Sequence, residues 1–130
     1  MALVFPDVGE NKALDHITNR VAPENWVLRL FTSNTTPAEG DTAVTYTEAS
    51  GSGYASVTLT GASWGAASGG SISYAQQTFT FTGALGNVYG YYYTEVTSGV
   101  LIAAERFTDG PYNIANNGDQ IKITPTVTAS

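Results

Sequence analysis

The feature that most constrains this chain is a series of short apolar and β-branched runs separated by turn residues, recurring roughly every ten to fifteen positions. Valine, threonine, tyrosine and phenylalanine favour extended backbone, and the Gly-, Asn- and Ser-rich separators favour chain reversal. Without a second helix to cross over a parallel sheet, the pattern predicts an all-β fold, an antiparallel β-sandwich or jelly roll. The expected strands are residues 25–33, 43–48, 54–60, 72–74, 77–82, 88–96, 100–107 and 120–127.

One short helix is expected before these strands. Across residues 9–21, apolar side chains such as Leu14 and Ile17 fall at helical spacing, and Pro23 provides a stop. We therefore divide the chain into an N-terminal arm and short helix over residues 1–22 and a single β-sandwich domain over residues 23–130.

The apolar tip of the chain is a candidate interface. Leu3, Val4 and Phe5 are consecutive apolar residues near a terminus, where side chains fray unless something covers them. We expect this arm to contact a partner subunit.

Composition excludes several classes of partner and site. Eleven acidic residues against five basic ones give a net charge of -6, which repels nucleic-acid phosphates and anionic lipid. The sequence has no cysteine, so disulfides, thiolate metal sites and cysteine nucleophiles are excluded. It shows no secretory signal and no run near the roughly 18 apolar residues of a membrane span. We expect a protein made in the cytoplasm, with no nucleic-acid or membrane partner.

No catalytic apparatus is recognisable in the sequence. Residues 61–65, Gly-Ala-Ser-Trp-Gly, match the letters of a hydrolase nucleophile elbow, but a Gly/Ser loop follows where a helix is required. The only histidine, His16, precedes the serine, and one imidazole without cysteine makes a poor zinc site. Turn geometry accounts for the acidic and amide residues of 116–119 better than calcium does. We expect no enzymatic activity, no metal and no cofactor.

A tyrosine-rich run is the feature most suggestive of binding. In an uninterrupted strand Tyr89, Tyr91 and Tyr93 share one face, with rings about 7 Å apart, and Tyr92 takes the other face. Such a ladder fits a core or a subunit interface, and it also fits a platform on which sugar rings stack. These three tyrosines join the N-terminal arm as candidate interface residues.

Three stretches carry a resemblance to a known family: WVLRLFTSNTTP at 26–37, QTFTFTG at 77–83 and AERFTDGPY at 104–112. Together they resemble the capsid decoration, or cement, proteins found among the head genes of tailed bacteriophages, over residues 4–125. The resemblance implies a β-sandwich or jelly-roll domain, commonly a homotrimer, that binds the major capsid protein on the outer shell and bridges neighbouring capsomers. It carries over no catalytic residues.

Two roles of different classes therefore remain open. The first is a capsid decoration protein on the surface of the virion. The alternative is a glycan-binding module of a phage tail or head fibre, with the tyrosine ladder as its site.

Overall fold

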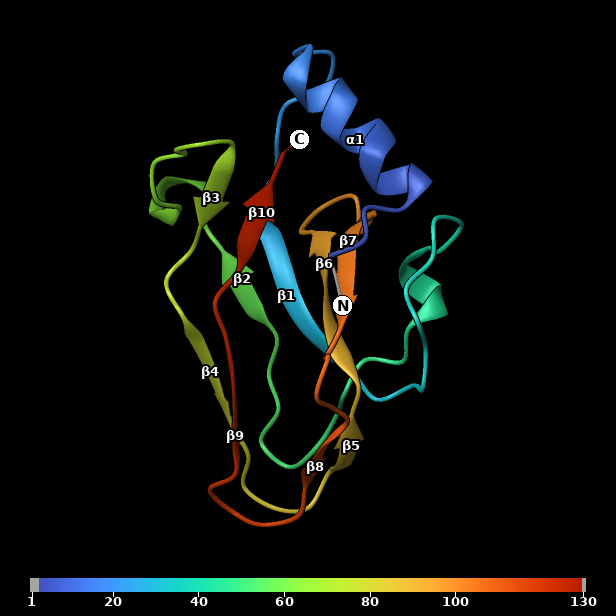
Figure 1. Ribbon diagram of the computed structural model, residues 1–130, viewed down its shortest axis with the longest axis vertical. Helices are drawn as coiled ribbons and strands as arrows, with labels where there is room; N and C mark the ends of the chain where they lie inside the picture. Colours follow the sequence, from blue (N-terminus) through green and yellow to red (C-terminus); the bar gives the residue numbers. More distant parts are fainter. Residues whose placement is uncertain (1–2, 130) are drawn as a thin grey trace.

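The computed structural model describes residues 3–129, which fold as a mostly antiparallel β structure with one N-terminal helix (Figure 1). The helix is α1 (Asp7–Ile17), and two short 3-10 turns are η1 (Ala43–Thr45) and η2 (Gly61–Ser63). The strands are β1 (Trp26–Phe31), β2 (Val57–Leu59), β3 (Ser71–Ser73), β4 (Gln77–Thr80), β5 (Gly86–Val88), β6 (Gly90–Glu95), β7 (Leu101–Arg106), β8 (Tyr112–Ile114), β9 (Gln120–Ile123) and β10 (Thr126–Thr128).

A four-stranded sheet in the order β2-β1-β6-β7 forms the centre of the molecule. β1 pairs along its whole length with β6, from Trp26 opposite Glu95 to Phe31 opposite Gly90. β6 and β7, from the expected strands 88–96 and 100–107, form an antiparallel hairpin with a register shift between Tyr93 and Thr94.

The remaining strands form three two-stranded sheets, β3 with β10, β4 with β9 and β5 with β8. Because β3 and β4 are consecutive, as are β9 and β10, the first two pairs continue as one bent ribbon, which runs down the left side of Figure 1. The expectation of antiparallel strands is confirmed. The arrangement of one four-stranded sheet and three pairs does not confirm the sandwich or jelly roll.

Two apolar clusters cover opposite faces of the central sheet. On one face Leu28, Leu30 and Tyr93 meet Phe79 and Ile121 of the ribbon in the main core. On the other face lies a smaller aromatic cluster, whose buried members are Phe31, Tyr46, Tyr92, Leu101 and Ala104. Leu30 and Phe31 thus point to opposite faces, as the alternation in β1 predicts.

Two expected strands are split because the chain changes partners within them. The run over 88–96 breaks at Tyr89, where β5, paired with β8, gives way to β6, paired with β1 and β7. The run over 120–127 breaks before β10 at Pro125, a residue without an N–H to donate. Residues 43–48 were expected as a strand and instead begin with the η1 turn, where Thr42 and Thr45 cap each other.

The helix is shorter than predicted and lies against the edge of the central sheet. It ends at Ile17, and Asn19 then adopts a positive φ of 61°, which stops the helix before Val21. Gly9 is buried against β7, where a Cβ would overlap the carbonyl oxygen of Ile102. The absence of a side chain at Gly9 therefore allows α1 to pack directly on the strand. In the part of the chain that the structure describes, no helix is long and apolar enough to cross a membrane.

Candidate functional site

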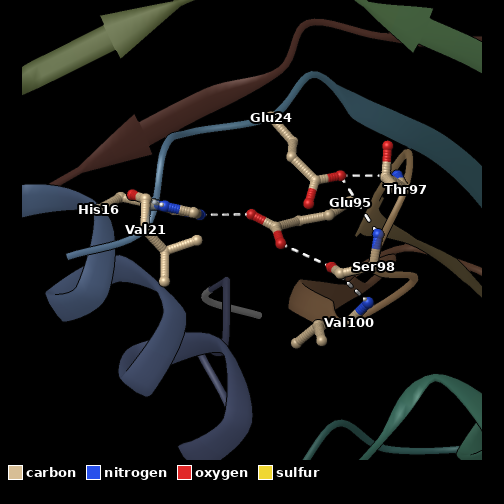
Figure 2. A network of polar contacts seen from close by, with 7 residues as sticks. All are labelled: His16, Val21, Glu24, Glu95, Thr97, Ser98 and Val100. Atoms are coloured by element: carbon tan, nitrogen blue, oxygen red, sulfur yellow. Dashed lines mark hydrogen bonds and ion pairs between the residues drawn. The ribbon is translucent and has the colours of Figure 1, made fainter. Parts of the chain in front are cut away.

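A polar network joins α1 to the turn between β6 and β7 (Figure 2). His16 Nε2 lies 2.5 Å from Oε2 of Glu95, and His16 Nδ1 donates to the carbonyl oxygen of Val21 at 3.0 Å. The other oxygen of Glu95 accepts a hydrogen bond from Ser98 Oγ at 2.6 Å. The Glu95 side chain is fully buried, so these bonds replace the water that a carboxylate otherwise requires.

A second carboxylate completes the network from the loop that follows α1. Glu24 Oε1 accepts the backbone N–H groups of Thr97 at 2.6 Å and Ser98 at 3.2 Å, as Figure 2 shows. The bond from Thr97 holds the pKa of Glu24 below its usual value. The carbonyl of Val21, together with Glu95, raises the pKa of His16. The network thus fixes α1, the following loop and the hairpin turn relative to one another.

The order of these groups does not make a hydrolase. A nucleophilic serine needs a base at its hydroxyl, with an acid behind the base. Here Ser98 bonds to Glu95, which lies between it and His16, so the imidazole does not reach the serine hydroxyl and the order of a Ser-His-acid triad is absent from these three residues. Ser63 of the Gly-x-Ser-x-Gly match lies in the η2 turn, with no helix after it. The geometry of both serines therefore fits a structural role.

Only one group of three potential metal ligands comes together among residues 3–129. Carboxylate oxygens of Asp7, Glu10 and Glu39 lie within 4.8 Å of one another, and all three residues are exposed. Asp119, at the end of the 116–119 turn, accepts the backbone N–H groups of Ala115 and Asn116 at 3.0 Å, as expected of a carboxylate that closes a turn.

The tyrosine run does not form a ladder on one face, so that expectation is wrong. Tyr91 and Tyr93 face the main core, but Tyr89 packs with the opposite aromatic cluster because the strand is interrupted there. Tyr93 is fully buried, and Tyr91 is half-buried and donates from its hydroxyl to Glu105 at 2.7 Å. The Arg106 guanidinium lies 5.1 Å from the centre of the Tyr89 ring. An interface role remains a prediction for Tyr89 and Tyr91, whereas Tyr93 serves the domain's own core.

Instead, the aromatic residues form a continuous row of seven rings, which sequence reasoning missed. Neighbouring ring centres are 5.2 Å apart for Tyr74 and Trp64, 5.5 Å for Trp64 and Trp26, 5.3 Å for Trp26 and Tyr93, 5.6 Å for Tyr93 and Tyr91, 6.1 Å for Tyr91 and Phe107, and 4.5 Å for Phe107 and Tyr112. The rings come from elements far apart in sequence, so no local pattern could have revealed the row.

The N-terminal arm packs on its own chain. Val4 exchanges two backbone hydrogen bonds with Ala104 of β7, at 2.8 and 2.9 Å. Leu3 and Phe5 are half-buried against the main core. Whether the exposed parts of Leu3, Val4 and Phe5 also meet a partner stays a prediction.

A large apolar opening lies between α1 and β10, and we call it the α1/β10 groove. Its volume is about 580 Å³. Leu14 and Ile17 form the helix wall, and they are 61% and 79% exposed. The remaining lining residues are Phe5, Glu10, Ala13, His16, Trp26, Ile102, Val127, Thr128 and Ala129. The helical spacing of Leu14 and Ile17 marked an apolar face, but it could not show that this face is open to solvent.

Comparison with known proteins places the chain in a family. Residues 5–128 match the family model described as podophage GP4 fiber I protein gp80. Neither the curated proteins nor the solved structures contain a match. The family is one of fibre components, so the expectation of a capsid decoration protein is wrong and the fibre alternative is better supported. By this match over nearly its whole length, the chain belongs to the podophage GP4 fiber I protein gp80 family.

Proposed function

We propose that the protein is a structural subunit of a podophage fibre, which acts by binding other polypeptides and performs no chemical step. The family match over residues 5–128 carries this proposal. Two features of the molecule support it. His16, Glu95 and Ser98 form hydrogen bonds that join α1 to the turn after β6, which is a structural arrangement. The exposed apolar side chains Leu14 and Ile17 favour contact with another protein, since apolar patches on a surface commonly mark such contacts.

The test is to locate and count the protein in purified particles. Immunogold labelling should mark the fibres, and quantitative mass spectrometry should give the copy number of a fibre component. Label spread over the head shell, at a copy number that follows the major capsid protein, would contradict the proposal. So would particles that lack the protein.

Self-association belongs to the same proposal. We expect the isolated chain to form homotrimers, and light scattering coupled to size-exclusion chromatography measures the mass directly. A monomer at all accessible concentrations would contradict the expected trimer.

Glycan binding is a second candidate role for the fibre subunit. Trp64 and Tyr74, at one end of the aromatic row, are half-buried and so keep part of their rings accessible, as sugar stacking requires. A glycan array probed with the wild-type protein and with Trp64→Ala tests this role. Binding that the substitution leaves unchanged would exclude Trp64 as the site.

A further inference from the structure

We infer that the α1/β10 groove receives an extended segment of a different polypeptide, which pairs with the free edge of β10. The segment would carry apolar side chains at every second position and a basic residue where it passes Glu10. That the partner belongs to a fibre rests on the proposed function. The pairing of the segment with β10 does not.

The first observation is the open edge of β10. Tyr74 N–H donates to the carbonyl of Pro125, and Ala129 N–H donates to the carbonyl of Gly70. In an antiparallel pair, the backbone N–H and C=O groups of alternate residues point toward the neighbouring strand. Those of Val127 therefore point toward β3, and those of Thr128 point away from it. Among residues 3–129, no partner exists for the backbone N–H and C=O of Thr128, which lines the groove. A strand laid along this edge would satisfy both groups, as in peptide recognition by strand addition.

The second observation is the chemistry of the walls. The groove runs between this strand edge and the apolar face of α1, with Trp26 and Ile102 among its lining residues. Successive side chains of a strand point to opposite faces. An incoming strand would therefore turn every second side chain toward the groove, where Leu14 and Ile17 are open to solvent.

The third observation is charge. Glu10 lines the groove, and its carboxylate has no hydrogen-bond or ion-pair partner in the described part of the chain. The carboxylates of Asp7 and Glu39 lie close beside it. A lysine or arginine on the incoming segment would complement this negative end of the groove.

A second copy of this chain is a poor occupant. Segments with the required alternation, such as β9 with Ile121 and Ile123, are already paired and buried in their own sheets. The segment therefore comes from another polypeptide.

The experiment places a photo-crosslinking benzoylphenylalanine at position 14 of the full-length protein, in infected cells and in purified particles. We expect an adduct with a different polypeptide, and mass spectrometry should locate it in a segment with alternating apolar residues and a basic residue. Thr128→Pro removes an N–H that β3 does not use, together with one hydroxyl contact to Ser71 of β3. It should reduce the adduct, or the incorporation of the protein, by at least about tenfold.

Ser73→Pro is the matched control. It removes an N–H that points away from β10 and keeps the carbonyl that accepts from Gly65. Like Thr128→Pro, it also removes one hydroxyl contact between β3 and β10, that of Ser73 with Thr126. This variant should keep the adduct, and both proline variants should melt at similar temperatures because edge positions tolerate proline. An adduct with a second copy, an adduct that Thr128→Pro leaves intact, or no adduct at position 14 would overturn the inference. Absence of the wild-type protein from particles would instead overturn the proposed function, and the adduct in infected cells would still decide the inference.

Discussion

His16 Nε2 lies 2.5 Å from Oε2 of Glu95, although 79 positions separate the two residues in sequence. The pair joins the last turn of α1 to the end of β6, and only 15% of the histidine side chain is exposed. The attachment of the helix to the sheet therefore depends in part on one titratable group.

The stability of the protein should fall as pH rises through the raised pKa of His16. The unfolded histidine has the ordinary value of 6.5, and hydrogen bonds to Val21 and Glu95 raise the pKa in the folded state. The folded protein therefore holds this proton more tightly. The resulting stabilisation is fully present below pH 6.5 and is lost as pH rises through the folded pKa. Lys12 opposes this shift and Glu95 favours it.

Denaturant unfolding at several pH values measures this dependence, with His16→Asn as the comparison. The variant should be less stable at low pH and should lose the slope above pH 6.5. If the free energy of unfolding changes with pH to the same extent in both proteins, a group other than His16 causes the dependence.

Replacing Glu95 should be more damaging than a surface substitution. Glu95→Ala removes the partner of both His16 and Ser98 inside the protein, and breaking a buried charged pair costs about 3–5 kcal/mol. Glu95→Gln keeps the shape and one acceptor oxygen, so its loss should be smaller. Equal losses in the two variants, measured by chemical denaturation, would show that the charge of Glu95 matters here and its volume does not.

Gly9→Ala should weaken the packing of α1 on the sheet. The added methyl group would overlap the carbonyl of Ile102, and overpacking of this kind costs about 1–3 kcal/mol. Gly40→Ala is the control, because no atom lies within 4 Å of a Cβ built there. Thermal melting of both variants decides the matter: a lower melting temperature for Gly9→Ala alone is expected. A wild-type melting temperature would mean that the helix can shift to make room.

Tyr91 and Tyr93, which lie on the same face of β6, should respond differently to loss of the hydroxyl. The buried Tyr93 hydroxyl has no hydrogen bond of normal geometry in the described structure, although the Tyr91 hydroxyl lies near enough to affect its pKa, so Tyr93→Phe should cost little or nothing. Tyr91→Phe removes the bond to Glu105 and leaves its carboxylate with one donor fewer, so a loss of about 1–3 kcal/mol is expected. Unfolding free energies that rank the two variants in the opposite order would contradict this reading of the core.

Much of the fold could be predicted from local pattern. The faces of β1, the β6–β7 hairpin and the existence of α1 follow from short-range alternation or helical spacing, which the sequence displays directly. The splitting of residues 88–96 and 120–127 could not be predicted, because it depends on which distant strand each half pairs with. β8 was missed because Tyr112, Asn113 and Ile114 make too short a run to stand out among turn residues.

The candidate sites were less predictable. Leu14 and Ile17 were recognisable as one apolar helix face, but whether such a face is covered depends on the placement of β10 at the other end of the chain. The pairing of His16 with Glu95 likewise joins residues without a shared motif. The tyrosine run suggested binding because one uninterrupted strand would place three rings on one face. The strand changes partners at Tyr89, so that arrangement does not form.

The row of seven rings also predicts the intrinsic fluorescence of the protein. Rings with centres 5.2 to 5.6 Å apart connect Tyr74, Tyr91 and Tyr93 to the two tryptophans. At such separations an excited tyrosine passes its energy to indole before it can emit. The native protein should therefore fluoresce almost entirely as tryptophan, and tyrosine emission should appear only when the row comes apart, giving an internal optical signal of unfolding that needs no added dye.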